Sequence, residues 1–335
     1  MLKIKSPYDM HLHLRDKEML ESVAKFSAKY FSGGVVMPNL AQPISSVDLA
    51  LAYKQRILAA CGDDNFTPFM TLYLNENLDK KELQRAVEND IRILKLYPKG
   101  ATTNSENGVS DVLSPKMLEI LEIAQELGFF LSIHGESGGF SLDREVEFHP
   151  IFSELAQTFP KLKIIFEHLS DRRSIALVEK YENLFATLSL HHISMSLDDV
   201  IGGALNPHNF CKPILKLPQD RDALLSVALS AHSKFAFGSD SAPHLKSAKE
   251  TAKGAAGIFS APILLPALIE IFEKHNKLEN LEKFVSLNAQ KIYNLKGDSK
   301  EIVLVKKEMK IPELIDGICP LRAGEILSWS YAENV

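Results

Sequence analysis

Residues 9–16 read DMHLHLRD, and the interpretation of this stretch decides the fold. If it forms a strand, its polar side chains point to one side and its apolar side chains to the other, because residues two apart in a strand share a face. The polar row is Asp9, His11, His13 and Arg15, and the apolar row is Met10, Leu12 and Leu14. Such alternation is typical of a strand with one face in water. In a sheet that is covered on both faces, the polar row would instead lie inside the protein.

Short apolar segments recur along the chain, and a stretch of helical periodicity follows most of them. The eight segments are LKIKSPYDMHLHL (2–14), GGVVMPN (33–39), TPFMTLYLN (67–75), IRILKLYP (91–98), FFLSIHGE (129–136), LKIIFEHLS (162–170), LFATLSLHH (184–192) and KFAFGSDSAP (234–243). Two helices have clear signals at their ends. We expect one to follow Ser46 as its N-cap, and another to have Ser114 as N-cap, Pro115 as first residue and Gly128 at its end.

A strand followed by a helix, repeated eight times over about 250 residues, is the pattern of an α/β protein with a (β/α)8 TIM-type barrel. An open doubly wound sheet is the alternative, but the sequence lacks the GxGxxG and P-loop motifs of its nucleotide-binding form. We expect one domain over residues 1–335, with the barrel strands within about residues 1–245. Residues 246–335 would form a helical and extended tail that packs on the barrel and includes KEIVLVKKEMKI and AGEILSWSY.

Composition narrows the possible partners. The net charge of −5 is modest and not clustered, which argues against nucleic acid and anionic membranes as partners and favours a small molecule.

The N-terminus lacks a secretory apolar core, and the most apolar later stretch is interrupted by Pro262 and Pro266. The three cysteines show no CxxC spacing, so we expect neither disulfides nor a thiolate zinc site. These features favour a cytoplasmic protein.

Histidines gather where the predicted strands end. In a TIM-type barrel the active site lies at the carboxyl ends of the strands. The polar residues there are His11, His13, Arg15, Asn39, Lys95, His134, His168, His191, His192 and Asp240. Imidazoles and a carboxylate without thiolates match the ligands of Zn²⁺, and Co²⁺ or Mn²⁺ would accept them too. A single histidine at a strand end is more often structural, so the prediction rests on the joint pattern.

Lys95 lies in the apolar stretch RILKLY, where a lysine is almost never fully buried without a partner. A salt-bridged or partly exposed lysine is one interpretation. The other is a carbamate, formed from lysine and CO₂, whose two oxygens bridge metal ions. Two Zn²⁺ ions bring four positive charges, and the carbamate, Asp240 and a bridging hydroxide remove three of them. The remaining positive charge suits an anionic substrate.

The histidines, Lys95 and Asp240 together resemble the binuclear amidohydrolase superfamily. Finer motifs resemble the compact dihydroorotase family, which lacks a flanking β-sandwich domain. These motifs are DMHLHLRD, VVMPNL, LKLYPKGATTNS, IHGE, EHLS, NPHNFCKPILK and FGSDSAPH. The resemblance runs from about residue 7 to AGEILSW, which is nearly the whole chain.

The resemblance implies a role for individual residues. The metal ligands would be His11, His13, Lys95 and Asp240 for one Zn²⁺ and Lys95, His134 and His168 for the other, with carboxylated Lys95 and a hydroxide bridging the two ions. The substrate carboxylate would meet Arg15, Asn39 and His244. Thr102 and Thr103 would lie in a lid loop, and Ala256 and Lys212 would offer main-chain contacts. A lysine at position 212 makes that last contact unusual, and His191 and His192 have no ligand role in this pattern.

The activity implied is the reversible cyclisation of N-carbamoyl-L-aspartate to L-dihydroorotate in pyrimidine synthesis, with Asp240 as the proton shuttle. A homodimer is implied in the same way. Three alternatives stay open at this point. They are another cyclic amide hydrolase that acts on hydantoins or allantoin, a mononuclear deaminase with Glu136 as its acid, and a non-catalytic scaffold that has kept the barrel.

Overall fold

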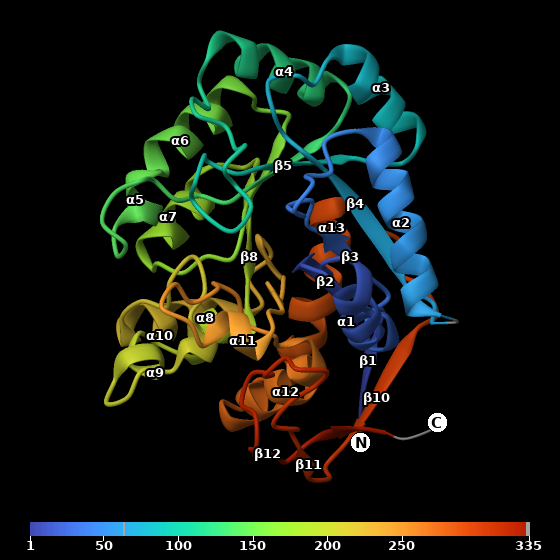
Figure 1. Ribbon diagram of the computed structural model, residues 1–335, viewed down its shortest axis with the longest axis vertical. Coiled ribbons are helices and arrows are strands. Elements are labelled where there is room, and N and C mark those ends of the chain that lie inside the picture. The colour runs from blue at the N-terminus through green and yellow to red at the C-terminus, as the bar shows by residue number, and fades with distance from the viewer. Residues whose placement is uncertain (63, 333–335) are drawn as a thin grey trace.

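The computed structural model describes residues 1–62 and 64–332, and its centre is a parallel sheet of eight strands in chain order (Figure 1). The strands are β2 (Tyr8–Leu12), β3 (Gly33–Val36), β4 (Thr67–Tyr73), β5 (Ile93–Leu96), β6 (Phe130–Ile133), β7 (Lys163–Phe166), β8 (Leu184–Leu188) and β9 (Phe235–Phe237). The sheet closes on itself just beyond β9. There the Asp240 amide donates to the His11 carbonyl at 2.8 Å, and the His13 amide donates to the Ser241 carbonyl at 3.0 Å. The predicted barrel is confirmed.

Helices surround the strands. They are α1 (Lys17–Tyr30), α2 (Val47–Cys61), α3 (Lys80–Glu88), α4 (Pro115–Glu126), α5 (Arg144–Glu147), α6 (His149–Thr158), α7 (Arg173–Lys180), α8 (Leu190–Ser194), α9 (Asp198–Ile201) and α10 (Pro218–Ser230), with the short turn η1 (Pro207–Asn209) before α10. Both predicted caps are confirmed, because the Ser46 side chain accepts from the Leu49 amide and the Ser114 side chain from the Met117 amide. Gly128 follows α4 with a φ of 74°, as a helix end requires.

The stretch predicted as one first strand is two strands in different sheets. β1 (Leu2–Lys5) leaves the barrel and pairs antiparallel with β10 (Glu301–Val305), which also pairs with β13 (Ser330–Tyr331). The break lies at Ser6, whose φ is 43°, and at Pro7, which has no amide hydrogen for a ladder. The prediction of a single strand over residues 2–14 was therefore wrong.

The strict alternation predicted for residues 9–15 also fails at one position. The pairing of β2 with β3 shifts register between Asp9 and Leu12. Met10 joins the cluster inside the barrel, whereas Leu12 and Leu14 join the cluster between barrel and helices. A β-bulge moves side chains from one face to the other, so Met10 does not share a side with the two leucines.

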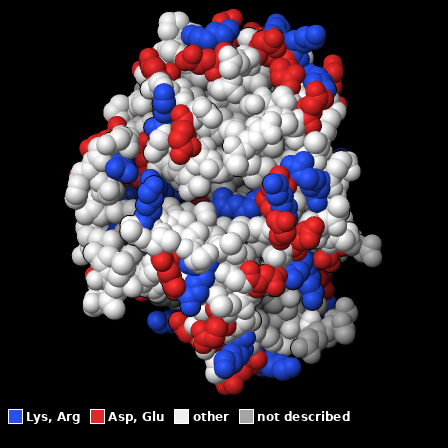
Figure 2. Space-filling view, in the orientation of Figure 1, with Lys and Arg blue, Asp and Glu red and all other residues white. Residues whose placement is uncertain are grey.

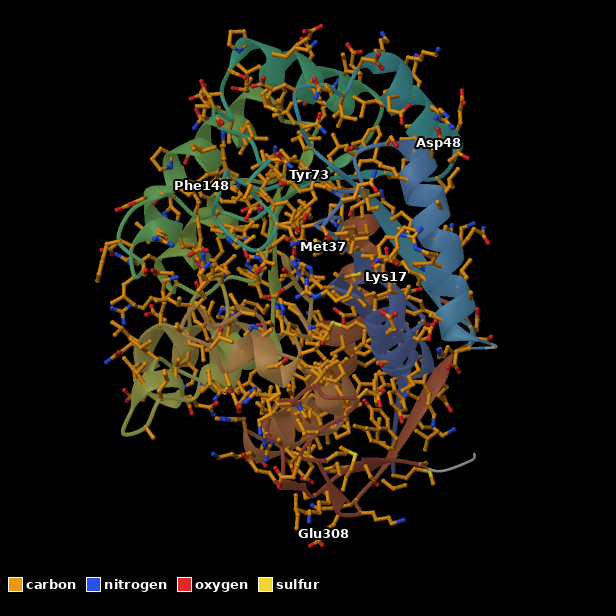
Figure 3. The ribbon with its side chains drawn as sticks, viewed as in Figure 1. Lys17, Met37, Asp48, Tyr73, Phe148 and Glu308 are labelled. Carbon is orange, nitrogen blue, oxygen red and sulfur yellow. The ribbon has the colours of Figure 1, made fainter. Side chains whose placement is uncertain are left out.

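A hydrophobic cluster fills the inside of the barrel and includes Ile93, Ile165 and Ala236. Every barrel strand contributes at least one side chain to it, and side chains from all eight strands can meet only on the inner face. α13 (Asn288–Tyr293) contributes Ile292 and Tyr293 to the same cluster, and the Tyr293 ring lies 5.0 Å from that of Phe130 at the start of β6. α13 therefore closes the amino-terminal end of the barrel. Side chains occupy the space between strands and helices throughout (Figure 3).

The C-terminal part adds helices and short strands. After the barrel come α11 (Lys246–Lys249), η2 (Ala261–Ile263), α12 (Leu264–Lys274), η3 (Leu278–Asn280), the π-helix η4 (Lys283–Leu287) and α13, and then β10, β11 (Met309–Lys310), β12 (Ile326–Leu327) and β13. Helices and extended segments were both expected here. Leu268 and Phe272 on α12 and Leu304 on β10 belong to the cluster that also packs on the barrel.

The surface in Figure 2 carries charged side chains of both signs around its edge and is hollowed near its centre, where lysine or arginine side chains border the hollow. Among the described helices, none combines the length and hydropathy that a bilayer crossing needs.

Because α13 closes the end of the barrel, the removal of one of its buried side chains is expected to destabilise the fold. Ile292 is 2% exposed, so Ile292→Ala is expected to lower the free energy of unfolding by roughly 2–5 kcal/mol through a buried cavity. Leu287, on the preceding helical turn, is 49% exposed and provides the control. Leu287→Ala should change the free energy of unfolding little. Urea denaturation of both variants measures this, and equal effects would show that α13 does not seal the barrel.

Candidate active site

The carboxyl ends of the barrel strands surround a small cavity of about 20 Å³. Its lining is His11, His13, Arg15, Asn39, Tyr97, Thr102, Thr103, His134, His168, Lys212, Asp240, Ala242, Ala256 and Gly257. All the predicted site residues are in this lining except Lys95 and His244, and both of these contact residues that line it. The fold therefore brings the predicted site residues together at one end of the barrel.

The first group of possible metal ligands forms at the seam between β9 and β2. The Nε2 atom of His13 lies 3.2 Å from Oδ1 of Asp240, and the Nε2 atom of His11 lies 3.5 Å from the same oxygen. One nitrogen or oxygen from each side chain therefore points to a common centre. Burial lowers the pKa of both imidazoles, which keeps them in the neutral form that binds metals.

The second group lies beside the first. Nδ1 of His134, after β6, is 3.1 Å from Nε2 of His168, after β7. The ring of His168 is 4.8 Å from that of His134 and 4.8 Å from that of His11, so the two groups adjoin. Burial also places the pKa of His168 well below its usual value. The two imidazoles therefore add nitrogen atoms of the kind that bind metals beside the first group.

Two glutamates hold the outer nitrogens of these histidines. Glu167 lies 2.9 Å from Nδ1 of His11, and Glu136 lies 2.8 Å from Nε2 of His134. Such contacts fix the tautomer and ring orientation of a ligating histidine. Glu136 was expected as a possible deaminase acid, but it is 2% exposed and paired with His134.

Glu167 was missed by the sequence analysis, although it directly precedes His168 in the motif EHLS. Its carboxylate also accepts from the hydroxyls of Ser132 and Thr187, the latter at 2.6 Å. Burial raises the pKa of Glu167, but His11, Lys95 and the hydrogen bonds outweigh burial and lower this pKa to about 2. Glu167 is therefore an anion inside the barrel.

Lys95 is fully buried on the inner face of β5, two residues beyond Ile93. Its Nζ has no hydrogen-bond partner and no carboxylate within 4.0 Å among the described residues. Burial lowers its pKa to about 8, although Glu167 and Asp240 act in the opposite direction. The ammonium lies 5.0 Å from the ring centre of Tyr97, whose hydroxyl also lacks a partner within the described chain. Tyr97 lines the cavity, and the sequence analysis missed it as well.

Arg15 presents hydrogen-bond donors to the same cavity. Arg15 donates from Nε to the Pro243 carbonyl at 3.0 Å, and its Nη2 lies 2.9 Å from Nε2 of His244. Nε2 of His244 is also 2.9 Å from the Ala256 carbonyl. No carboxylate of the described residues pairs with Arg15. An arginine held in this way has donors left for an anion in the cavity.

A loop covers the cavity between Pro98 and Val109, which pair as a β-bridge. The Asn39 side chain donates to the Thr103 carbonyl at 3.0 Å, and the Asn104 side chain donates to the Asn39 carbonyl at 2.9 Å. A cavity of about 20 Å³ holds little more than one water-sized sphere. The loop therefore lies directly over the space that a ligand would occupy.

Three residues around the cavity have a strained backbone. The φ angles are 58° for Arg15, 39° for His168 and 46° for Asp240, in a region that residues with a side chain rarely adopt. Such strain costs of order 1–3 kcal/mol per residue and collects at functional sites.

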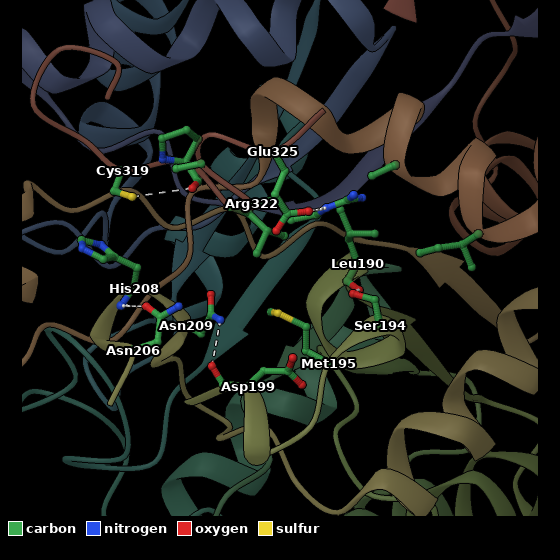
Figure 4. A pocket seen from close by; sticks show the side chains of 15 residues that line it. Leu190, Ser194, Met195, Asp199, Asn206, His208, Asn209, Cys319, Arg322 and Glu325 are labelled. Atoms are coloured by element: carbon green, nitrogen blue, oxygen red, sulfur yellow. Dashed lines mark hydrogen bonds and ion pairs between the residues drawn. The ribbon is translucent and has the colours of Figure 1, made fainter. Parts of the chain in front are cut away.

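A larger hollow of about 510 Å³ lies elsewhere, between α8, η1, α12 and the segment around Arg322 (Figure 4). Its lining includes none of the predicted site residues. Arg322 is already paired with Glu325 at 2.7 Å and Glu270 at 3.1 Å. The convergence of side chains, and not cavity size, therefore marks the candidate active site.

Comparison with known proteins agrees with this geometry. The amidohydrolase family profile matches residues 76–295. A dihydroorotase from Helicobacter hepaticus is 58% identical over 99% of this chain and 98% of its own length. The crystal structure of a dihydroorotase from Campylobacter jejuni is 46% identical and superposes with a TM-score of 0.94 over 99% of this chain and 97% of that one. A Saccharomyces cerevisiae dihydroorotase in complex with 5-fluoroorotic acid is 35% identical, with a TM-score of 0.92 over 99% of both chains.

The backbone at Gly238 packs so closely against neighbouring strands that a side chain there is expected to destabilise the protein. A Cβ on Gly238 would lie 2.9 Å from the His11 Cβ and 3.0 Å from the Thr187 Cβ, so Gly238→Ala is expected to cost roughly 1–3 kcal/mol of unfolding free energy. Gly138→Ala is the control, because nothing lies within 4 Å of the added Cβ. Urea denaturation of the metal-free protein compares the two, and equal stability would mean that the seam tolerates side chains.

Proposed function

This chain belongs to the dihydroorotase family of amidohydrolases, and from that premise we propose that it interconverts L-dihydroorotate and N-carbamoyl-L-aspartate in UMP synthesis. Family membership makes it a hydrolase with a metal cofactor and a small-molecule substrate. The observation that carries the proposal is the meeting of four histidines, Asp240 and Lys95 at one end of the barrel, beside Arg15. Among the described residues, Lys95 has no hydrogen-bond partner and Arg15 pairs with no carboxylate.

Two Zn²⁺ ions are proposed as the cofactor. His11, His13, Lys95 and Asp240 would hold one ion, and Lys95, His134 and His168 the other. The proximity of both Nε2 atoms to Oδ1 of Asp240 supports the first set, and the 3.1 Å separation of the other two imidazoles supports the second. When bound, the ions would supply a nucleophile from water and polarise the scissile carbonyl.

Lys95 would link the two sets as a carbamate. The Lys95 ammonium first loses one proton. The uncharged Nζ then attacks CO₂, a nitrogen–carbon bond forms as one carbon–oxygen π pair moves onto oxygen, and Nζ releases a second proton, so that the buried cation would become an anion with two ligand oxygens. Burial favours this step because it lowers the pKa of Lys95 to about 8 and so makes the neutral amine accessible. A lysine that carried a salt bridge would resist it, and this one has none within the described residues.

Asp240 would move the proton. During ring opening its carboxylate takes the proton from the attacking water and gives it to the ring nitrogen that leaves, and cyclisation follows the reverse path. Asp240 is 5% exposed and its backbone amide donates to the His11 carbonyl, which supports this role because it keeps the residue beside the proposed ligands.

Arg15, Asn39 and His244 would bind the substrate carboxylate. The guanidinium of Arg15 is oriented by the Pro243 carbonyl and His244, which leaves other N–H groups for a planar carboxylate. The amides of Lys212 and Ala256 donate to no acceptor of the described residues, and the Ala256 carbonyl is near His244, so these two N–H groups are available to the ring.

Thr102 and Thr103 would form the lid. In the closed loop the Thr103 carbonyl accepts from Asn39, a residue that is itself proposed to touch substrate. Exchange of that bond for a bond to the substrate would couple binding to loop movement and exclude water from the reaction.

We further propose one domain over residues 1–335, a homodimer and a cytoplasmic location. Family resemblance supports the dimer, and the charge pattern and free cysteines support the location.

The first test mixes purified, metal-quantified protein with L-dihydroorotate and follows the ultraviolet absorbance that ring opening removes. Wild type is expected to turn over with about two metals per chain, and Lys95→Ala is expected to lose both the second metal and nearly all turnover. Lys116→Ala, an exposed lysine on α4, is the control and should keep both. Hydrolysis of an uncharged hydantoin without turnover of dihydroorotate would contradict the proposed substrate.

The carboxylate contact predicts a binding defect. Arg15→Ala removes a charge-assisted hydrogen bond worth about 1.5–3 kcal/mol, so KM for dihydroorotate should rise on the order of 10- to 100-fold. The effect on kcat should be smaller because this carboxylate is remote from the reacting carbonyl. Arg85→Ala, an exposed arginine paired with Asp48, should leave both constants unchanged. Steady-state kinetics decides, and an unchanged KM in Arg15→Ala would remove Arg15 from the substrate site.

A further inference from the structure

Two adjacent histidines on α8 have opposite surroundings. His192 uses both ring nitrogens, since Nδ1 lies 2.8 Å from the Ser189 hydroxyl and Nε2 lies 3.0 Å from the Pro213 carbonyl. His191 is 0% exposed, and neither of its nitrogens has a hydrogen-bond partner among the described residues. Buried polar groups are normally satisfied, so an imidazole with two orphaned nitrogens calls for an explanation.

A carboxylate close to His191 points to that explanation. Its Nε2 lies 3.8 Å from Oδ2 of Asp240, while His11 and His13 approach the other oxygen, Oδ1, at 3.5 and 3.2 Å. The two oxygens of the carboxylate therefore face different neighbours. A separation of 3.8 Å is too long for a hydrogen bond, but a small rotation of the carboxylate closes it, and such contacts commonly tighten only in the working enzyme.

A third metal ion is the competing explanation, because a nitrogen of His191, a nitrogen of His192 and the Cys211 sulfur lie within 4.8 Å of one another. An ion there would displace existing bonds. The Cys211 thiol donates to the Pro213 carbonyl at 3.2 Å, and both nitrogens of His192 are already used. Burial also raises the pKa of Cys211, which disfavours the thiolate that a metal requires.

We propose that His191 is a positioning residue, which donates a hydrogen bond from Nε2 to Oδ2 of Asp240 and so keeps Oδ1 directed at His11 and His13. This inference rests on the proposed function, because it assigns a purpose to the orientation of the carboxylate that moves the proton. A carboxylate free to rotate would present the wrong oxygen for part of the time. His191 therefore acts on kcat through Asp240 and does not touch the substrate.

The test compares two replacements. His191→Gln can present an amide N–H near the position of Nε2, whereas His191→Leu cannot donate. His191→Leu is expected to lower kcat by roughly 10- to 100-fold, as loss of contacts behind a metal ligand does, with KM nearly unchanged. His191→Gln should restore most of the rate. His275→Leu and His275→Gln, at an exposed histidine after α12, are matched controls and should match wild type.

A second measurement separates positioning from folding and from the proposed reaction. The visible spectrum of the Co²⁺-loaded protein reports on the ligands of the ion whatever the substrate is, and it should change in His191→Leu but not in His191→Gln. That result without any dihydroorotate turnover in wild type would keep the inference and reject the proposed substrate. Wild-type kcat and spectrum in His191→Leu, or equal loss in both variants, would overturn the inference.

If His191→Leu does not fold, His191→Asn replaces it, because its shorter amide cannot reach the position of Nε2. Activity and spectrum retained in His191→Gln and lost in His191→Asn would support the hydrogen bond. Equal behaviour of these two variants would overturn it.

Discussion

Closure of the barrel between β9 and β2 is the constraint on which the rest of the site depends. Two backbone hydrogen bonds join the segments, from Asp240 to His11 and from His13 to Ser241. Ser239 adds a side-chain contact to the buried carboxylate of Asp9 at 2.6 Å. Because main-chain groups make the seam, the fold itself sets the carboxylate of Asp240 beside two imidazoles that are far away in the sequence. The absence of a side chain at Gly238 permits this approach.

Burial gives the assembled groups their chemistry. Burial lowers the pKa of His11, His13 and His168, because the charged form of an imidazole is disfavoured away from water. The neutral rings offer lone pairs and do not repel cations. The anionic Glu167 offsets part of the cost by accepting from three neighbours. Among the described residues, no hydrogen-bond partner compensates the burial of Lys95 in this way. The proposed carbamate would remove its buried positive charge. Strain at His168 and Asp240 is maintained by the same surrounding packing.

The sequence predicted much of this arrangement because the barrel repeats one simple unit. Seven of the eight strand segments became single barrel strands, and Ser46 and Ser114 cap helices as their side-chain chemistry requires. The predictions that were wrong concern residues whose structure is set by contacts with distant parts of the chain. Residues 2–14 form two strands that separate at Ser6, because β1 pairs with β10 outside the barrel. Met10 faces the inside of the barrel because of a β-bulge, which simple alternation of side chains does not predict. Glu167 went unnoticed because its role depends on His11, a residue of another strand.

The sequence by itself determined the order of strands that makes a barrel and the class of enzyme, and it predicted the residues of the site: histidines, a lysine and an aspartate at strand ends, with an arginine beside them. These follow from spacing along the chain, which a reader of the sequence sees directly. Only the tertiary structure decided which nitrogen of each histidine faces the cavity, that Lys95 has no hydrogen-bond partner among the described residues, and that His191 lies near Asp240 while His192 is satisfied. It also decided that Asn39 is the residue that holds the loop at Thr103. These depend on distances of a few ångströms between segments from different strands, and such distances exist only after the barrel has closed.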